Sequence, residues 1–315
     1  MYEEISSNKW KSMLMMFLFF VFVLGIGYII GRAWRGSDGW YFGVIIAFVI
    51  ALIMGLVSFY KSDSIALRIS GAREVGEGEY PRYRHAVEGL AIAAGVPPPR
   101  IYVINSPAPN AFATGRNPEH SAIAVTTGLL DMLSDQELEG VIAHEMSHIK
   151  NYDILIMCLT VVLVGTVILI SDIFLRTFWF GDSDDSGGGG AWIFMIIAIV
   201  LAILAPIIAQ LVKLAIGRKR EFLADANGAL LTRYPPGLAG ALEKLQSDPR
   251  QFKRANKATA HMFIVQPLKT SKGARGGRFN RLFDTHPPIE ERIRRLNQMS
   301  GGFVPTQPGE APTVE

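Results

Sequence analysis

The chain has 315 residues, 50% of them hydrophobic, and its mean hydropathy is +0.26. That is more apolar than a soluble domain of this length requires. A formal net charge of only +3, without interleaved basic and aromatic residues, argues against nucleic-acid binding. The single cysteine, Cys158, excludes a disulfide framework within the chain, and we interpret it as a small apolar packing residue.

Four apolar blocks predict transmembrane helices at residues 13–30, 40–59, 154–175 and 192–216. Each is close to the roughly 20 residues that cross a hydrocarbon core about 30 Å thick. A secretory signal is the alternative for the first block. That block is longer than a typical signal core and lacks a small-x-small cleavage site after it, so we expect an uncleaved span.

Lysine and arginine predict the orientation of these spans, since cytoplasmic loops carry an excess of both. Of the 31 basic residues, 17 follow the fourth block and eight lie in 61–153. The short connections contain only Arg32, Arg35 and Arg176. We therefore expect both termini and 61–153 in the cytoplasm, with the basic C-terminal part attracted to anionic lipid.

Residues 61–153 predict a folded α/β segment. A helical pattern over 80–94 ends at Gly95, before three prolines. Alternating runs at 100–106, 110–114 and 122–126 predict a small antiparallel sheet. Ser134 and Glu137 have the spacing of a capping box, so we expect a helix from Asp135 through His148.

Beyond the third block, 181–190 is a flexible polar turn in our interpretation. After the fourth, 217–231 and 237–245 predict helices, 248–279 is a basic stretch of low order, and 283–296 predicts a helix that begins at proline. In chain order, we expect an N-terminal hairpin 1–60, a first catalytic part 61–153, a second hairpin 154–216, a second catalytic part 217–298 and a disordered tail 299–315.

The predicted helix at 135–148 carries a candidate metal site. His144 and His148 are four positions apart, so both imidazoles can reach one ion from the same helix face. Glu145 follows the first histidine without ligating the metal. In zinc peptidases with this spacing, the ion acidifies a bound water and the glutamate accepts its proton. Such sites have three protein ligands and one open position, so a third ligand should lie elsewhere.

Glu221 is the best candidate for that third ligand. It follows the fourth block, and the histidines precede the third, so antiparallel neighbouring spans would bring them together. Asp225, one helical turn later, could accept the second ring N–H of a ligand histidine. The alternative is a solvated acidic face paired with Arg218 or Arg220.

With these motifs the chain resembles the HtpX-like proteases, membrane zinc metallopeptidases related to the CAAX prenyl endopeptidases. The resemblance covers residues 10–298 and is carried by "PNAFATG" at 109–115, "HEMSH" at 144–148, "REFLADANGA" at 220–229 and "THPP" at 285–288. It implies one zinc ion per chain, held by His144, His148 and Glu221, with Glu145 as general base. Gly217 and Asp284 stand where the family often has serine, which affects only expectations of local packing.

The resemblance implies further roles. The strand residues Ala111, Phe112 and Ala113 would line the cleft, with Asn110 facing the reacting carbonyl. His286 would stabilise the oxyanion, since a fourth protein ligand leaves no position for the catalytic water.

For Arg292 and for the remaining histidines, an ordinary structural role is the alternative to a role in the site. Arg292 could hold a substrate carbonyl or carboxylate, although Glu290 and Glu291 offer ordinary pairing on a helix surface. We expect the remaining histidines in cores or on surfaces: His85, His120 and His261.

The expected fold is an α+β membrane protein, with four transmembrane helices and a cytoplasmic, mainly helical zincin-type catalytic domain containing the small antiparallel sheet. The resemblance implies an endopeptidase of a prokaryotic cell membrane that cleaves misfolded or damaged membrane proteins, with other membrane proteases as further partners. An edge strand can bind extended unfolded polypeptides through main-chain hydrogen bonds.

Three alternatives remain. A dedicated processing peptidase for one membrane-anchored substrate would have more spans if it resembled the CAAX enzymes. A transporter needs polar groups at mid-membrane, and the blocks contain almost none. A non-catalytic zinc-binding scaffold would not need Glu145.

Overall fold

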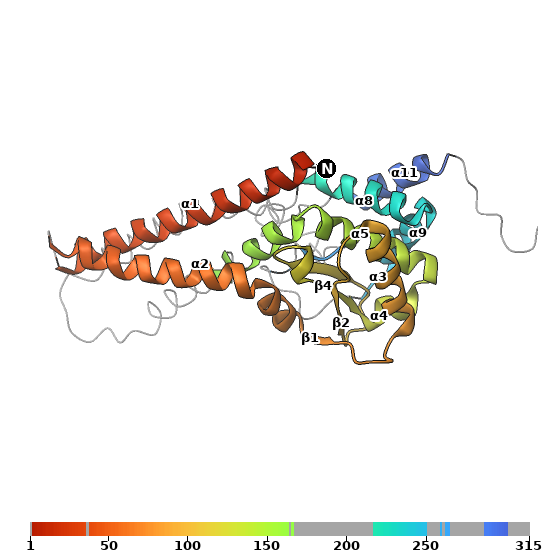
Figure 1. The fold of residues 1–315 in the computed structure, drawn as a ribbon, viewed down its shortest axis with the longest axis horizontal. Coiled ribbons are helices and arrows are strands. Elements are labelled where there is room, and N and C mark those ends of the chain that lie inside the picture. Colours follow the sequence, from red (N-terminus) through yellow and green to blue (C-terminus); the bar gives the residue numbers. More distant parts are fainter. Residues whose placement is uncertain are drawn as a thin grey trace, which may run out of the picture.

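Two long helices form a hairpin that extends to one side of the molecule (Figure 1). The computed structural model describes residues 2–35, 38–163, 165–166, 217–250, 259, 262–264 and 287–301. Helix α1 is Tyr2–Arg35 and helix α2 is Trp40–Ser70. The segments Ile5–Ile29 and Trp40–Ser70 are long and apolar enough to cross a membrane, in agreement with the first two expected spans.

Glycines allow close approach within this hairpin. A Cβ added at Gly43 would lie 2.0 Å from the backbone oxygen of Gly27, and one at Gly27 would lie 2.3 Å from the Cβ of Ala47. Small residues at such a contact are typical of helices that associate in lipid, where close van der Waals packing drives association. Large apolar side chains along both helices stay exposed, among them Phe17, Ile45 and Ile53.

The third expected span is described only in part. Helix α5, Asp135–Lys150, is followed after a bend of 82° by the helix Asp153–Leu163. Beyond Leu163 only residues 165–166 of the expected span 154–175 are described, and the expected span 192–216 lies outside the described residues. The four-span count therefore stays a prediction.

The sheet is mixed, so the prediction of an antiparallel sheet was wrong. Its strands β1 (Ala72–Glu74), β2 (Arg100–Ile104), β3 (Ala111–Gly115) and β4 (Ser121–Thr126) lie in the order β1-β2-β4-β3. The outer pairs are antiparallel, but β2 and β4 are parallel. The linker 105–110 takes the chain from β2 to the outer edge of the sheet, where β3 forms. Strand β4 then occupies the place between β2 and β3.

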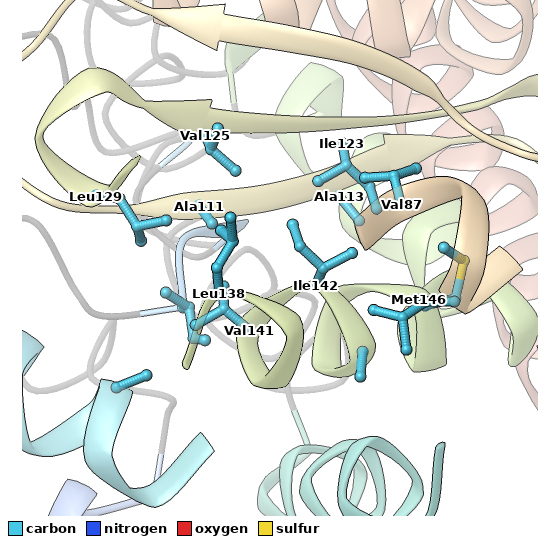
Figure 2. Close-up of a cluster of buried hydrophobic side chains, with 14 of the residues drawn as sticks. Val87, Ala111, Ala113, Ile123, Val125, Leu129, Leu138, Val141, Ile142 and Met146 are labelled. Carbon is cyan, nitrogen blue, oxygen red and sulfur yellow. The ribbon is translucent and has the colours of Figure 1, made fainter. Parts of the chain in front are cut away.

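The sheet separates two apolar layers. On one face, Ile123 and Val125 of β4 pack on Val141 and Ile142 of α5 (Figure 2). The alternate residues Ala122 and Ala124 face the other way, where they join a cluster with residues of the helix Asp153–Leu163. Because successive strand residues point to opposite faces, β4 is buried along its whole length. This packing holds β3 and α5 side by side.

Three C-terminal helices complete the described fold: α8 (Arg218–Thr232), α9 (Pro235–Ser247) and α11 (Ile289–Met299). They confirm the helices expected near 217–231 and 237–245, and α11 follows Pro288 as a proline-initiated helix. Helix α3, Pro81–Ala94, also agrees with expectation. The short helix α4, Thr127–Met132, was not expected.

The N-terminus of α5 has the predicted capping box. The Ser134 hydroxyl accepts from the backbone N–H of Glu137, whose carboxylate accepts from the backbone N–H of Ser134 at 2.8 Å. These bonds satisfy donors that the first helical turn would leave unpaired. The helix start therefore lies where the sequence predicted it, and with it the angular position of both histidines.

Candidate metal centre

The histidines of α5 lie on its buried face. His144, Glu145 and His148 are 1%, 2% and 3% exposed. Burial of ionisable groups is unfavourable unless each finds a partner. The partners of these three side chains therefore define what the site can do.

Helix α8 brings Glu221 to the two imidazoles. Ligand atoms of His144, His148 and Glu221 all lie within 4.8 Å of one another. The two Nε2 atoms are 3.2 Å apart, and Glu221 oxygens lie 3.6 Å from Nε2 of His148 and 3.9 Å from Nε2 of His144. Ligands about 2.0–2.2 Å from a tetrahedral zinc lie about 3.3–3.6 Å from one another, so this spacing suits one small ion.

A glycine lets α8 approach α5 closely enough for this contact. A Cβ added at Gly228 would lie 3.1 Å from the backbone nitrogen of His144 and 3.3 Å from the carbonyl carbon of Ala143. Those neighbours are backbone atoms, so a side chain at 228 would require one helix to move. The glycine thereby keeps Glu221, earlier on α8, within reach of the histidines.

Both imidazoles are oriented by carboxylates on their Nδ1 atoms. His144 Nδ1 lies 2.9 Å from Asp225 Oδ1, and His148 Nδ1 lies 3.0 Å from Asp153 Oδ2. These contacts turn both Nε2 atoms toward Glu221. The sequence predicted a support role for Asp225 but missed Asp153. Asp153 returns to His148 because α5 ends at Lys150 and Tyr152 adopts a φ of 61°, a local turn that helical spacing does not predict.

Arg292 holds Asp225 in place. Its side chain is fully buried and donates to both oxygens of Asp225, at 2.9 Å from Nε and 2.7 Å from Nη2. Pairing with surface glutamates, the alternative from the sequence, was wrong, since Glu291 pairs with Arg294 and Arg295 instead. Burial alone would raise the pKa of Asp225, but Arg292 and His144 lower it to about 2.

Glu145 and His148 have shifted pKa values for different reasons. Burial raises the pKa of Glu145 to about 7, despite opposing contributions from His148 and from a hydrogen bond to the backbone of Ala113. Burial lowers the pKa of His148, but the bond to Asp153 and the charge of Glu221 outweigh it and raise that pKa to about 9. A carboxyl group with a pKa near neutrality is well matched to proton transfer.

Strand β3 is one of the two outer strands of the sheet and lies beside α5, and its residues Ala111, Phe112 and Ala113 are all buried. The chain itself already uses part of this edge, because the Ile264 N–H donates to the oxygen of Ala111 at 3.0 Å.

The structure describes some of the remaining predicted residues but not His286 or His261. Asn110 is buried beside Thr126, with its Oδ1 accepting from the Ala111 N–H at 3.1 Å. His85 and His120 are exposed, in contrast to the buried His144 and His148. His286 and His261 lie outside the described residues. The substrate-facing roles of Asn110, Arg292 and the β3 residues stay predictions.

Comparison with known proteins identifies the family of this chain. Residues 79–300 match the model of peptidase family M48. The chain belongs to peptidase family M48. It is 44% identical over 302 residues to a protein named "Protease HtpX homolog" from Dictyoglomus turgidum, covering 95% of this chain and 94% of the relative. A protein of the same name from Pyrococcus abyssi is 48% identical over 280 residues, with 88% and 91% covered.

Among solved structures, the crystal structure of S. mikatae Ste24p is similar, with a TM-score of 0.46 and 21% identity over 94% of this chain and 66% of that chain. Family membership, the HtpX-homolog relatives and the two span-length helices identify this M48 chain as a membrane metalloprotease. Its two imidazoles and one carboxylate form a donor set that suits zinc and neighbouring divalent metals.

Proposed function

We propose that this protein is a zinc-dependent endopeptidase of a prokaryotic cell membrane. His144, His148 and Glu221 hold the ion, and Glu145 is the general base. The convergence of those three ligand atoms within 4.8 Å, beside a buried glutamate, carries the proposal. Zinc in such a site supplies an acidified water and polarises the scissile carbonyl.

The residues around the ion have separate tasks in this mechanism. Glu145 would accept the proton of the attacking water and pass it to the leaving amine, and its burial at 2% exposure beside the ligand histidines places it for that role. Asp225 and Asp153 keep the Nδ1 atoms of the ligand histidines occupied, so that their Nε2 atoms face the ion. Arg292 keeps Asp225 ionised.

The proposed substrates are misfolded or damaged membrane proteins. A strand added along β3 is recognised through its main chain, which does not require a particular sequence. Incubation with a mixed pool of membrane proteins tests this, with a Glu145→Gln variant to identify background cleavage. Many cleaved proteins with varied sites are expected. Cleavage of one protein at one site would instead identify a dedicated processing peptidase.

The proposed orientation has the metal centre in the cytoplasm and the two short loops outside. The charge distribution supports it, with 17 of 31 basic residues after the fourth block. Cysteines introduced singly at Ser37 and Ser183 should react with an impermeant thiol reagent in intact cells, while the buried native Cys158 should not. Labelling of a cysteine introduced at Ser247, with no labelling at Ser37 or Ser183, would reverse the proposed orientation.

His286 is proposed as the donor that stabilises the oxyanion. Replacing it by alanine should leave zinc content normal and lower kcat about 100- to 1000-fold, the cost of losing one such donor. Because the donor acts in the transition state, kcat and kcat/KM should fall together. If His286 only helps to orient α11, which begins just after Pro288, the variant should lose thermal stability and retain kcat within a few-fold of wild type.

A further inference from the structure

A buried asparagine joins the first membrane helix to the metal centre. Asn8 lies in α1, before the apolar block 13–30, and is 1% exposed. Its Nδ2 donates to Asp153 Oδ1 at 2.8 Å, and the other oxygen of Asp153 lies 3.0 Å from His148 Nδ1. Two consecutive hydrogen bonds therefore connect α1 to a proposed zinc ligand.

The contact determines how the Asp153 carboxylate is held. Its Oδ1 accepts from Asn8 and, at 3.4 Å, from Arg220 Nη1, which also donates to Asn8 Oδ1 at 3.4 Å. With Oδ1 engaged by two donors, Oδ2 faces His148. Asp153 is only 1% exposed, so without the bond from Asn8 its buried Oδ1 would retain the longer contact from Arg220 and the carboxylate would be held less firmly.

Asn8 also binds the backbone at the bend between the helices. Its Nδ2 donates to the backbone oxygen of Asn151 at 2.9 Å, and Asn151 is the C-cap residue of α5. One side chain thus contacts both Asn151 and Asp153, on either side of the bend of 82°. An apolar residue at position 8 could make neither contact.

We propose that Asn8 is a positioning residue for the metal centre, which orients His148 toward the ion by holding Asp153. The inference rests on the proposed function as a zinc peptidase. It makes zinc affinity depend on the packing of α1 against the catalytic helices, so the membrane hairpin supports the site as well as anchoring it.

The test measures the zinc dissociation constant of the full-length protein in detergent by competition with a chromophoric chelator. Asn8→Ala should weaken zinc binding about tenfold, the lower end of the range for groups that support a ligand histidine. The visible spectrum of the cobalt-substituted protein should change as well, since it reports ligand geometry. In an Asp153→Ala background, Asn8→Ala should have no further effect on zinc affinity.

Ser12→Ala is the matched control. Ser12 is buried one turn later on α1, and its hydroxyl donates to the backbone oxygen of Asn8 at 2.8 Å, so its loss perturbs the helix without removing a donor to Asp153. Asn8→Leu keeps a side chain of similar shape and serves if Asn8→Ala fails to fold. Zinc affinity within twofold of wild type in the folded variant, or an equal loss in Ser12→Ala, would overturn the inference.

The outcome also separates this inference from the function on which it rests. A wild-type protein that binds no zinc would refute both. A wild-type protein that binds zinc and loses it on His148→Ala, together with unchanged affinity in Asn8→Leu, would refute only the role of Asn8.

Discussion

Replacing Glu145 by glutamine should abolish proteolysis while zinc stays bound. Glutamine has nearly the same shape and can still accept the hydrogen bond from the backbone of Ala113, but it cannot take a proton from water. Loss of a general base costs about 100- to 10,000-fold in rate. The measurement pairs cleavage of an unfolded polypeptide with zinc content per chain.

Glu139→Gln is the control for this variant, because Glu139 lies on the same helix with an exposed side chain. It should retain full activity. If Glu145→Gln instead loses its metal in proportion to its activity, Glu145 is a ligand, and the proposed division of roles along α5 is wrong.

Replacing any of the three proposed ligands by alanine should remove the metal itself. His144, His148 and Glu221 each contribute one of three protein ligands in the proposed site, so the loss should exceed the roughly 100-fold upper range for residues that only support a ligand. Zinc content after dialysis against a chelator measures it. His85→Ala and His120→Ala, at exposed positions, should bind zinc as the wild type does.

Glu221→Ala is the most informative of these variants. If it kept full zinc affinity, Asp225 would be the next candidate ligand. Asp225 would then have to give up at least part of its contact with Arg292, whose two donors lie 2.7 and 2.9 Å from its oxygens. That exchange would leave a fully buried arginine without its main partner, at a cost of several kcal/mol.

The parts of this site that follow local rules could be predicted from the sequence. Ser134 and Glu137 identified the start of α5, and the spacing of four residues put His144 and His148 on one face. The proximity of Glu221 was inferred from the order of apolar blocks, and the structure brings its carboxylate to the histidines. Periodicity and capping depend on neighbours within a few residues, which a single sequence displays.

The parts that depend on distant contacts could not be predicted in this way. The sheet order was missed because β4 enters between two strands that precede it in the chain. Asp153 and Asn8 were missed because their contacts depend on a bend and on the packing of a helix from the far end of the chain. Arg292 was expected to bind substrate or to pair with the neighbouring glutamates of its own helix, because the sequence does not show its buried partner Asp225.

Gly228 makes the position of Glu221 depend on how closely α8 packs on α5. A methyl group there would meet backbone atoms of α5 at 3.1 and 3.3 Å, so α8 would have to retreat by a few tenths of an ångström. Metal–ligand bonds tolerate deviations of only about 0.2 Å, and Glu221 lies about two turns earlier on the same rigid helix. The displacement that a side chain at position 228 would force is therefore comparable with the tolerance of a metal–ligand bond. The absence of a side chain there keeps the Glu221 carboxylate close to the two histidines.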